Sequence, residues 1–297
     1  MPVPVHHRRR TVGGVDVFYR EARPPGVSPD APVVLLPHGY PCSSYEFRDY
    51  MRHLGEHWRL LAPDFPGCGY SATPEDFDYD FDGFSRFLED FVDALGVDRF
   101  ALYLHDFGTW IGLRLALRHP DRIAALIVQN GDIYEDVLGP KYASLKEVWQ
   151  MERAEGLAQL RPFVSREHFR DEFLNDVRPT VAERIPPDLW ELHWTMMTEQ
   201  RRENAARIIY DLKDNLRWFP RYQAWLRAHR PPTLILWGPQ DGYMPAESGS
   251  AWLRDLPQAE FHLLDAGHWL LETSLTEAVD LSRDFLARVH PPPREGA

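Results

Sequence analysis

The sequence contains little cysteine and no long apolar segment. Among its 297 residues Cys42 and Cys68 are the only cysteines, too few for a disulfide framework, so we expect a reducing compartment. The longest apolar runs, such as residues 124–128, are far shorter than the roughly 20 residues that span a membrane. The basic stretch at residues 6–10 is not followed by an apolar segment, so it is not a secretory signal. We therefore expect a cytoplasmic protein.

Positive charge is also in short supply. The chain has 33 Lys and Arg residues against 45 Asp and Glu residues, which gives a net charge of −12. A protein this acidic is poorly suited to neutralise phosphates, so neither nucleic acid nor an anionic membrane is an expected partner. Hydrophobic residues make up 44% of the chain and aromatic residues 13%, which is enough to build a sizeable core. The length fits one large domain, or a core with an inserted subdomain.

Short apolar segments recur along the chain and alternate with helical patterns. The expected strands are residues 15–20, 33–37, 60–63, 100–104, 124–129, 233–237 and 260–264. Several are apolar throughout, which is typical of strands buried on both faces of a parallel sheet. The apolar periodicity predicts helices over residues 81–95 and 110–118. This alternation predicts an α/β fold with an open sheet.

The alternation stops between residue 130 and about residue 217. This stretch is rich in Glu and Arg, has helical periodicity with proline-containing breaks, and shows no strand pattern. It is therefore predicted to be an all-helical insertion between two strands of the sheet. The resulting organisation is a first core segment at 1–131, an insertion at 132–216, and a second core segment at 217–297.

Asp106 follows directly on the apolar strand at 100–104, in the sequence His-Asp-Phe-Gly, and a helix begins at once. A strand, a sharp turn and a helix form the nucleophile elbow, whose usual nucleophile is the Ser of G-x-S-x-G. An acid at this position can instead cap the helix that follows.

Other strand ends carry further polar motifs. His38-Gly39-Tyr40-Pro41 follows an early strand, and Asp241 and His268 follow the last two strands. The order is then nucleophile, acid and base, all at the carboxyl ends of strands, where open α/β sheets build their sites. Taken singly, Asp241 could close an Asp-Gly turn and His268 could begin a helix.

These motifs resemble the α/β-hydrolase superfamily over nearly the whole chain, and in particular its branch of epoxide hydrolases and haloalkane dehalogenases. The matching motifs are H-G-x-P, H-D-x-G, W-G-x-x-D and G-H, in that order. The resemblance implies an α/β-hydrolase fold with a mostly parallel central sheet flanked by helices. It also implies that the insertion at 132–216 is a helical cap that acts as a substrate lid, and that no cofactor is needed. His38 and His105 lack the spacing of zinc ligands, so no metal site is expected.

The resemblance also implies residue roles. Asp106 would be the nucleophile, Asp241 the acid and His268 the base, with the backbone N–H groups of Tyr40 and Phe107 as the oxyanion hole. Some dehalogenases carry the triad acid after the sixth strand, where this chain has Asn130; Asp241 is therefore preferred, with nearby Asp132 as the fallback.

A carboxylate nucleophile favours attack on a saturated carbon, because the product is a stable alkyl ester that water then hydrolyses. In the dehalogenase pattern, a Trp follows the nucleophile and many members have Asn in H-G-N. This chain has Phe107 and Tyr40 there, which favours an epoxide, whose opening needs a proton donor such as Tyr. Tyr210 resembles the second cap tyrosine of epoxide hydrolases. The first has no clean match among Tyr134, Tyr142 and Trp149.

The sequence thus predicts a cofactor-independent epoxide hydrolase that acts with water on a small apolar substrate, with a homodimer as a candidate assembly. Residues expected to contact the substrate are His38, Tyr142, Trp149 and Trp269. One alternative is a haloalkane dehalogenase, including a fluoroacetate-type enzyme with halide donors from the cap. Another is a catalytically silent member that binds a small ligand.

Overall fold

A mixed β-sheet forms the centre of the structure. The computed structural model describes residues 2–24 and 31–292, which form eight strands in the order β1-β2-β4-β3-β5-β6-β7-β8. These strands are β1 (Val5–Val12), β2 (Val15–Ala22), β3 (Val33–Leu35), β4 (Arg59–Pro63), β5 (Phe100–His105), β6 (Ile123–Gln129), β7 (Thr233–Trp237) and β8 (Glu260–Leu263). The pairs β1–β2 and β2–β4 are antiparallel, and the other neighbours run parallel. The predicted mostly parallel sheet is therefore confirmed.

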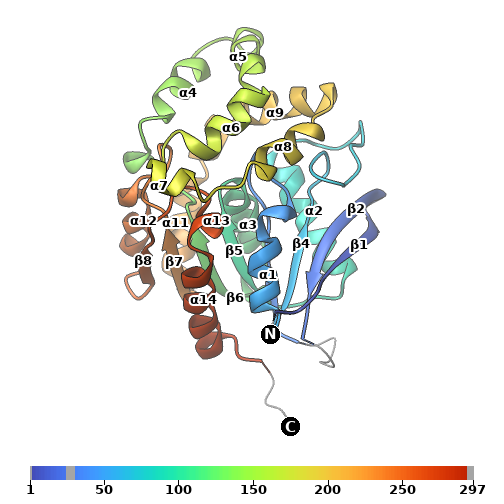
Figure 1. Cartoon of the computed structure of the whole chain (residues 1–297), viewed down its shortest axis with the longest axis vertical. Helices are drawn as coiled ribbons and strands as arrows, with labels where there is room; N and C mark the ends of the chain where they lie inside the picture. The colour runs from blue at the N-terminus through green and yellow to red at the C-terminus, as the bar shows by residue number, and fades with distance from the viewer. Residues whose placement is uncertain (1, 25–30, 293–297) are drawn as a thin grey trace.

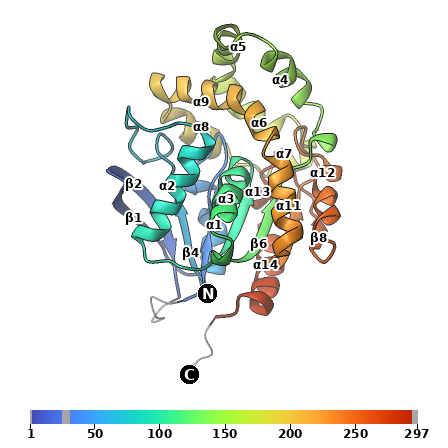
Figure 2. The same cartoon turned by 180° about the vertical axis from the view of Figure 1, so that it is seen from behind.

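Helices cover both faces of the sheet because its central strands are apolar on both sides. Leu102 and Leu104 of β5 join one hydrophobic cluster, while Ala101 and Tyr103 join the other. Figure 1 shows α1 (Arg48–Leu54) and α14 (Leu275–Val289) in front of the sheet. Seen from behind in Figure 2, α2 (Phe81–Ala94), α3 (Phe107–Arg118) and α11 (Phe219–His229) lie in front instead. The two helices predicted over 81–95 and 110–118 are thus present as α2 and α3.

A strand at one edge of the sheet was not expected from the sequence. The basic stretch at residues 6–10 lies within β1, which pairs with β2 along its whole length. Its central side chains are exposed, and Arg9 forms an ion pair with Asp16 of β2. Charged residues are common on edge strands because they discourage pairing with other chains. They also remove the apolar alternation by which a strand is recognised, so the sequence prediction was wrong here.

The chain between β6 and β7 is entirely helical, as predicted. Its helices before α11 are α4 (Tyr142–Trp149), α5 (Arg153–Leu160), α6 (Arg166–Leu174), α7 (Pro179–Ala182), α8 (Asp188–Thr195), α9 (Glu199–Asp211) and α10 (Lys213–Leu216). Figure 1 shows α4, α5, α6, α8 and α9 gathered at one end of the molecule. Phe219 of α11 instead packs against Trp110 of α3, in the core. The domain boundaries at 131/132 and 216/217 stay a prediction.

The helices of this insertion, called the cap from here on, have a core of their own. Phe169 and Phe173 of α6 and Leu189 of α8 are buried together in a third hydrophobic cluster. This cluster reaches the carboxyl ends of the strands, because Phe173 stacks on Trp269, just after β8, at 4.5 Å between ring centroids. The cap is therefore packed directly over the edge of the sheet where the predicted site residues lie. None of the described helices is both long and apolar enough to cross a membrane.

Candidate active site

Asp106 occupies a strained turn between β5 and α3. Its backbone has φ 47° and ψ −128°, a positive φ that costs a residue other than glycine about 1–3 kcal/mol. Its side chain makes no capping hydrogen bond to the helix, so the interpretation of Asp106 as a helix cap is wrong. A Cβ atom at Gly108 would lie 2.2 Å from the Pro37 carbonyl oxygen, so glycine is what lets α3 start this close to the loop after β3. This is the geometry of a nucleophile elbow.

The structure brings Asp106, Asp241 and His268 together from three separate strand ends. His268 Nδ1 lies 2.6 Å from Asp241 Oδ2, and His268 Nε2 lies 3.5 Å from Asp106 Oδ2. The imidazole therefore stands between the two carboxylates, with one nitrogen toward each. The contact with Asp241 is a short charge-assisted hydrogen bond. The contact with Asp106 is longer and weaker, so the chemistry at Asp106 can alter it.

Asp241 is held in place by its own turn and by Asn130. Its Oδ1 accepts hydrogen bonds from the backbone N–H groups of Tyr243 and Met244, at 2.9 and 3.0 Å. Its Oδ2 accepts one from Asn130 Nδ2 at 2.8 Å, and the same amide exchanges two hydrogen bonds with the backbone of Gly238. Asn130 thus orients the acid that follows β7. Asp241 therefore both closes the Asp-Gly turn and contacts His268, so the two interpretations of this residue do not exclude each other.

The three charged groups shift one another's pKa. Burial alone would lower the pKa of His268, but the charge of Asp241 and hydrogen bonds with both carboxylates raise it well above its usual range. Burial would raise the pKa of Asp106, but its hydrogen bond and attraction to His268 lower it. The pKa of Asp241 is lowered in the same way, because the charge of His268 outweighs burial. These opposite shifts favour an imidazolium between two carboxylates.

The loop after β3 places a backbone donor on the nucleophile. Tyr40 N–H donates a 2.7 Å hydrogen bond to Asp106 Oδ1. Phe107 is the first residue of α3, so its N–H is one of those at the helix end that have no acceptor within the helix. At Gly39 a Cβ atom would lie 2.5 Å from Asp106 Cβ, so the loop could not come this close with a larger residue. Of the two N–H groups expected to form the oxyanion hole, that of Tyr40 thus binds Asp106, and the role of Phe107 stays a prediction.

A cavity between the cap and the sheet contains most of the predicted site residues. Those that line it are Tyr40, Asp106, Phe107, Tyr142, Asp241, His268 and Trp269. They come from the strand ends and from the first cap helix, α4. The cavity is therefore shared by the core and the cap.

Tyr210 and Trp149 do not line this cavity, contrary to expectation. The Tyr210 hydroxyl donates to the Met151 carbonyl oxygen at 2.9 Å, and Trp149 Nε1 donates to the Ile209 carbonyl oxygen at 3.3 Å. Both side chains thus join cap helices to one another. The assignment of Tyr210 as the proton donor was wrong, because its sequence position did not reveal which side of α9 it occupies.

His38 and Tyr134 also lie away from the cavity that contains Asp106. His38 Nε2 accepts a hydrogen bond from Phe65 N–H at 3.1 Å, so its Nδ1 carries the proton and faces the Gly39 carbonyl oxygen at 2.9 Å. The His38 ring therefore links the loop after β3, which carries Tyr40, to the loop after β4. The Tyr134 hydroxyl donates to Asp255 Oδ2 at 2.7 Å, in the core.

The cavity residues missed from the sequence include Tyr243, Glu172 and Lys141. The Tyr243 hydroxyl lies 3.2 Å from Glu172 Oε1, and Lys141 Nζ lies 2.6 Å from Asp176 Oδ2 and 3.8 Å from Glu172 Oε2. Tyr243 follows the acid by two residues, a position that looks like ordinary turn sequence. Glu172 and Lys141 lie on or beside cap helices, where no motif marks them.

The indole N–H groups of this cavity donate to backbone carbonyl oxygens, whereas its two tyrosine hydroxyls lie beside carboxylates. Trp110 Nε1 donates to the Asp132 carbonyl oxygen at 2.7 Å, and Trp269 Nε1 donates to the Glu172 carbonyl oxygen at 3.4 Å. Burial raises the pKa of both Tyr142 and Tyr243, so both remain protonated at neutral pH. Within residues 2–24 and 31–292, no three His, Cys, Asp or Glu side chains are grouped so as to hold a metal ion.

Comparison of the sequence identifies a family and individual relatives. The family described as alpha/beta hydrolase fold matches residues 32–275. An uncharacterized hydrolase of Saccharomyces cerevisiae is 31% identical over 271 residues, which cover 90% of this chain and 92% of the yeast protein. Haloalkane dehalogenase 2 of Mycobacterium tuberculosis is 28% identical over 217 residues, or 71% of each protein.

Comparison of the structure gives the same fold. A haloalkane dehalogenase from Agrobacterium tumefaciens matches with a TM-score of 0.78 and 23% identity, over 96% of this chain and 97% of that one. An epoxide hydrolase matches with a TM-score of 0.75 and 17% identity, over 97% of this chain and 100% of that one. At such identities the likeness shows a shared fold and nothing finer.

Proposed function

The chain belongs to the α/β-hydrolase family and is a hydrolase of that type, and we propose that it hydrolyses an epoxide through a covalent ester on Asp106. The observation that carries this proposal is a carboxylate in the nucleophile elbow that faces a cavity with two tyrosine hydroxyls, those of Tyr142 and Tyr243. A carboxylate suits attack on a saturated carbon, and a neutral hydroxyl suits protonation of the alkoxide that leaves.

In the first step Asp106 Oδ2 attacks a ring carbon of the epoxide. Oδ1 is already bound by Tyr40 N–H, so Oδ2 is the oxygen free to form the new bond. The bond between that carbon and the ring oxygen breaks, and its electron pair stays on the oxygen. That oxygen takes a proton from the hydroxyl of Tyr142 or Tyr243. The products are a neutral alkyl ester on Asp106 and a tyrosinate that recovers its proton from solvent.

In the second step water attacks the carboxyl carbon of the ester. His268 accepts the proton of the water, and Asp241 stabilises the imidazolium that results. The negative charge that develops on Asp106 Oδ1 lies against the N–H groups of Tyr40 and Phe107. The bond between the carboxyl carbon and Oδ2 then breaks, and the diol leaves with that oxygen and takes the proton from His268. The water oxygen stays in the Asp106 carboxyl group, which loses its proton to solvent and becomes the carboxylate again. Esterification has removed the charge of Asp106, which is one of the causes that raise the pKa of His268. The imidazole is therefore a better base in the ester than in the free enzyme.

A second candidate is hydrolysis of a carbon–halogen bond, and the relative named haloalkane dehalogenase 2 favours it. The same triad would form and hydrolyse the same kind of ester. The difference lies in the leaving group, because a halide needs N–H donors that solvate it. In this cavity the indole N–H groups of Trp110 and Trp269 donate to backbone carbonyls, which supports the epoxide.

The His268→Gln variant tests the proposal by trapping the intermediate. Asp106 is an anion at neutral pH and needs no base to attack, so the variant should react once and then stall. Intact-protein mass spectrometry should show an adduct on Asp106 with the mass of the whole epoxide, because ring opening loses no atoms. A haloalkane would leave an adduct lighter than its substrate by the hydrogen halide.

The matched control is the double variant Asp106→Asn with His268→Gln, which should form no adduct. A panel of epoxides and haloalkanes separates the two candidates, since each gives a different mass shift. If a substrate that the parent protein hydrolyses leaves no adduct on the His268→Gln variant, the covalent mechanism is wrong. Ligand binding without turnover of any substrate would indicate a silent member of the family.

A further inference from the structure

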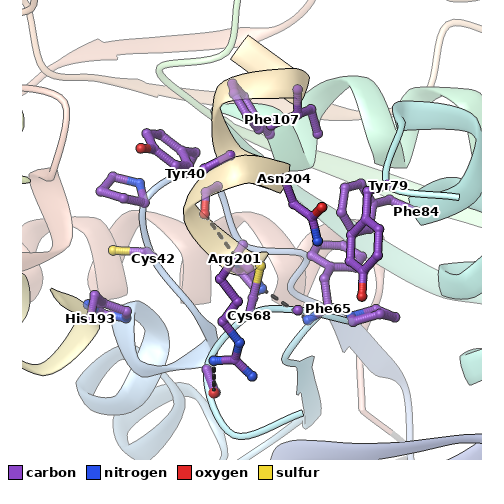
Figure 3. Close-up of a pocket in the computed structure, with 18 of the residues that line it drawn as sticks. Tyr40, Cys42, Phe65, Cys68, Tyr79, Phe84, Phe107, His193, Arg201 and Asn204 are labelled. Atoms are coloured by element: carbon purple, nitrogen blue, oxygen red, sulfur yellow. Dashed lines mark hydrogen bonds between the residues drawn. The ribbon is translucent and has the colours of Figure 1, made fainter. Parts of the chain in front are cut away.

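A second cavity lies beside the one that contains Asp106. It is formed between the loops after β3 and β4 and helix α9, and it holds about 740 Å³ of atom-free space, counting its open mouth. Figure 3 shows side chains from these segments around it, with Phe65 and Phe84 on the core side and Asn204 on α9. None of the triad residues lines this cavity. The mechanism therefore leaves it without a role.

The walls of the second cavity carry no free charge. The guanidinium of Arg201 is turned onto the core, where it donates to Thr73 Oγ1 and to the carbonyl oxygens of Gly69 and Ser71 at 2.7–2.9 Å. The charge of Arg201 is therefore stabilised by carbonyl oxygens and does not face into the cavity. Most of the remaining wall is aromatic and aliphatic, including Met196 and Met197. Such a surface favours a hydrocarbon.

Two cysteines and one histidine of this wall, Cys42, Cys68 and His193, are neutral at pH 7. Burial raises the pKa of Cys68 to about 12 and that of Cys42 well above its usual range, so both are thiols. Burial lowers the pKa of His193 to about 4. His193 is also fully bonded, because its Nδ1 faces the Leu189 carbonyl oxygen at 2.6 Å and its Nε2 faces Ser43 Oγ at 2.9 Å. These groups add polarisable surface without attracting an ion.

Three aromatic rings separate the two cavities. Tyr40, Phe107 and Phe169 line both of them, and the Tyr40 ring stacks on Phe107 at 5.7 Å between centroids. No hydrogen bond joins the Tyr40 hydroxyl to any residue in the described part of the chain, so packing alone holds this ring. Because Tyr40 N–H also binds Asp106, the partition lies directly beside the reacting carboxylate.

Helix α9 faces both cavities with neighbouring residues. Ile208 lines the second cavity, and Ile209, one residue later, lines the cavity of Asp106. The two cavities also differ in chemistry, since that of Asp106 includes charged Lys141 and Glu172. A substrate that occupies both would be apolar at one end and would react at the other.

We propose that the second cavity binds a hydrocarbon chain of the substrate, which passes between Tyr40, Phe107 and Phe169 while the reacting carbon lies at Asp106. The inference rests on the proposed function and narrows the substrate to epoxides that carry an extended apolar arm. Short epoxides fill the cavity of Asp106 alone and react less efficiently, because they gain nothing from burial of the chain.

Binding of unreactive 1-alkanols, from butanol to decanol, tests the cavity without any reaction. Isothermal titration calorimetry on the parent protein should show binding that tightens about three- to fourfold with each methylene until the cavity is full. Ile208→Trp should abolish this dependence on chain length. The matched control Arg207→Trp adds a tryptophan one residue earlier, on the exposed side of α9 and in neither cavity, and should retain it. Circular dichroism shows whether Ile208→Trp folds. If it does not, Ala205→Leu replaces it as the test variant, because it fills less of the same cavity.

Kinetics with terminal epoxides of four and ten carbons complete the test. Ile208→Trp should lower kcat/KM for the long epoxide by about tenfold or more and leave that for the short one within a factor of about two. Alkanol binding that ignores chain length, or equal losses in both variants, would overturn the inference. Chain-dependent binding without an adduct from any epoxide would leave the cavity assignment standing and refute the proposed reaction.

Discussion

Replacement of Asp132 by asparagine should stabilise the protein, and the gain should grow with pH. Asp132 is fully buried, and no positively charged side chain pairs with its carboxylate in the part of the chain that the structure describes. Burial raises the pKa of this carboxyl to about 7; the nearby Tyr142 hydroxyl opposes the rise, and the charges of Asp106 and Asp241 add to it. Asp132 is therefore harder to ionise in the folded protein than in the unfolded chain.

The size of the effect follows from the shift in pKa. An unfolded chain ionises an aspartate near pH 3.9, about three units lower, and each unit is worth about 1.4 kcal/mol. Because the folded pKa is the higher one, stability falls as pH rises between these two values. The loss is on the order of 4 kcal/mol at pH 8 and roughly 1–2 kcal/mol at pH 5. Asparagine stays neutral, so the Asp132→Asn variant should recover roughly 2–3 kcal/mol more at pH 8 than at pH 5.

Urea unfolding of the parent protein and the variant at pH 5 and pH 8 measures this difference directly. Any cost of burying the amide is the same at both pH values, so it cancels. Asp64 provides the control, because it is equally buried but accepts hydrogen bonds from Ser44 N–H and Tyr70 N–H at 2.8 Å. Asp64→Asn should destabilise the protein at both pH values. A gain for Asp132→Asn that is equal at pH 5 and pH 8, or a loss at pH 8, would refute the reasoning.

Two further predictions concern the separate steps of the reaction. Loss of the donating hydroxyl in Tyr142→Phe or Tyr243→Phe should slow alkylation by an epoxide by about 10²–10⁴, whereas Tyr210→Phe, outside the cavity, should leave it unchanged in stopped-flow experiments. An equal loss in all three variants would point to a structural effect. The rate of alkylation should not vary with pH down to about pH 4, because the pKa of Asp106 is lowered. The rate of ester hydrolysis should fall about tenfold for each pH unit at low pH, because His268 is protonated there and cannot act as the base. Single-turnover pH profiles that coincide for the two steps would contradict this.

The convergence of Asp106, Asp241 and His268 could be predicted from the sequence. Each residue follows an expected strand, and parallel strands end at the same edge of a sheet, so these residues were expected to lie together. The insertion could be predicted for a similar reason, since helical periodicity without strand patterns is a local property. Edge strand β1 could not, because its exposed charges carry no apolar alternation.

The residues that the cap contributes depended on tertiary structure. A helix turns by about 100° per residue, so one position decides which of two cavities a side chain faces, as Ile208 and Ile209 show. Tyr210, one residue further, turns toward Met151 and away from the cavity. Tyr243 enters the site from an ordinary turn only because Asp241 fixes that turn beside the cap. The sequence thus determined the sheet and its nucleophile, whereas the packing of cap helices on the sheet determined the groups around the substrate, because helix rotation is set by contacts between distant segments.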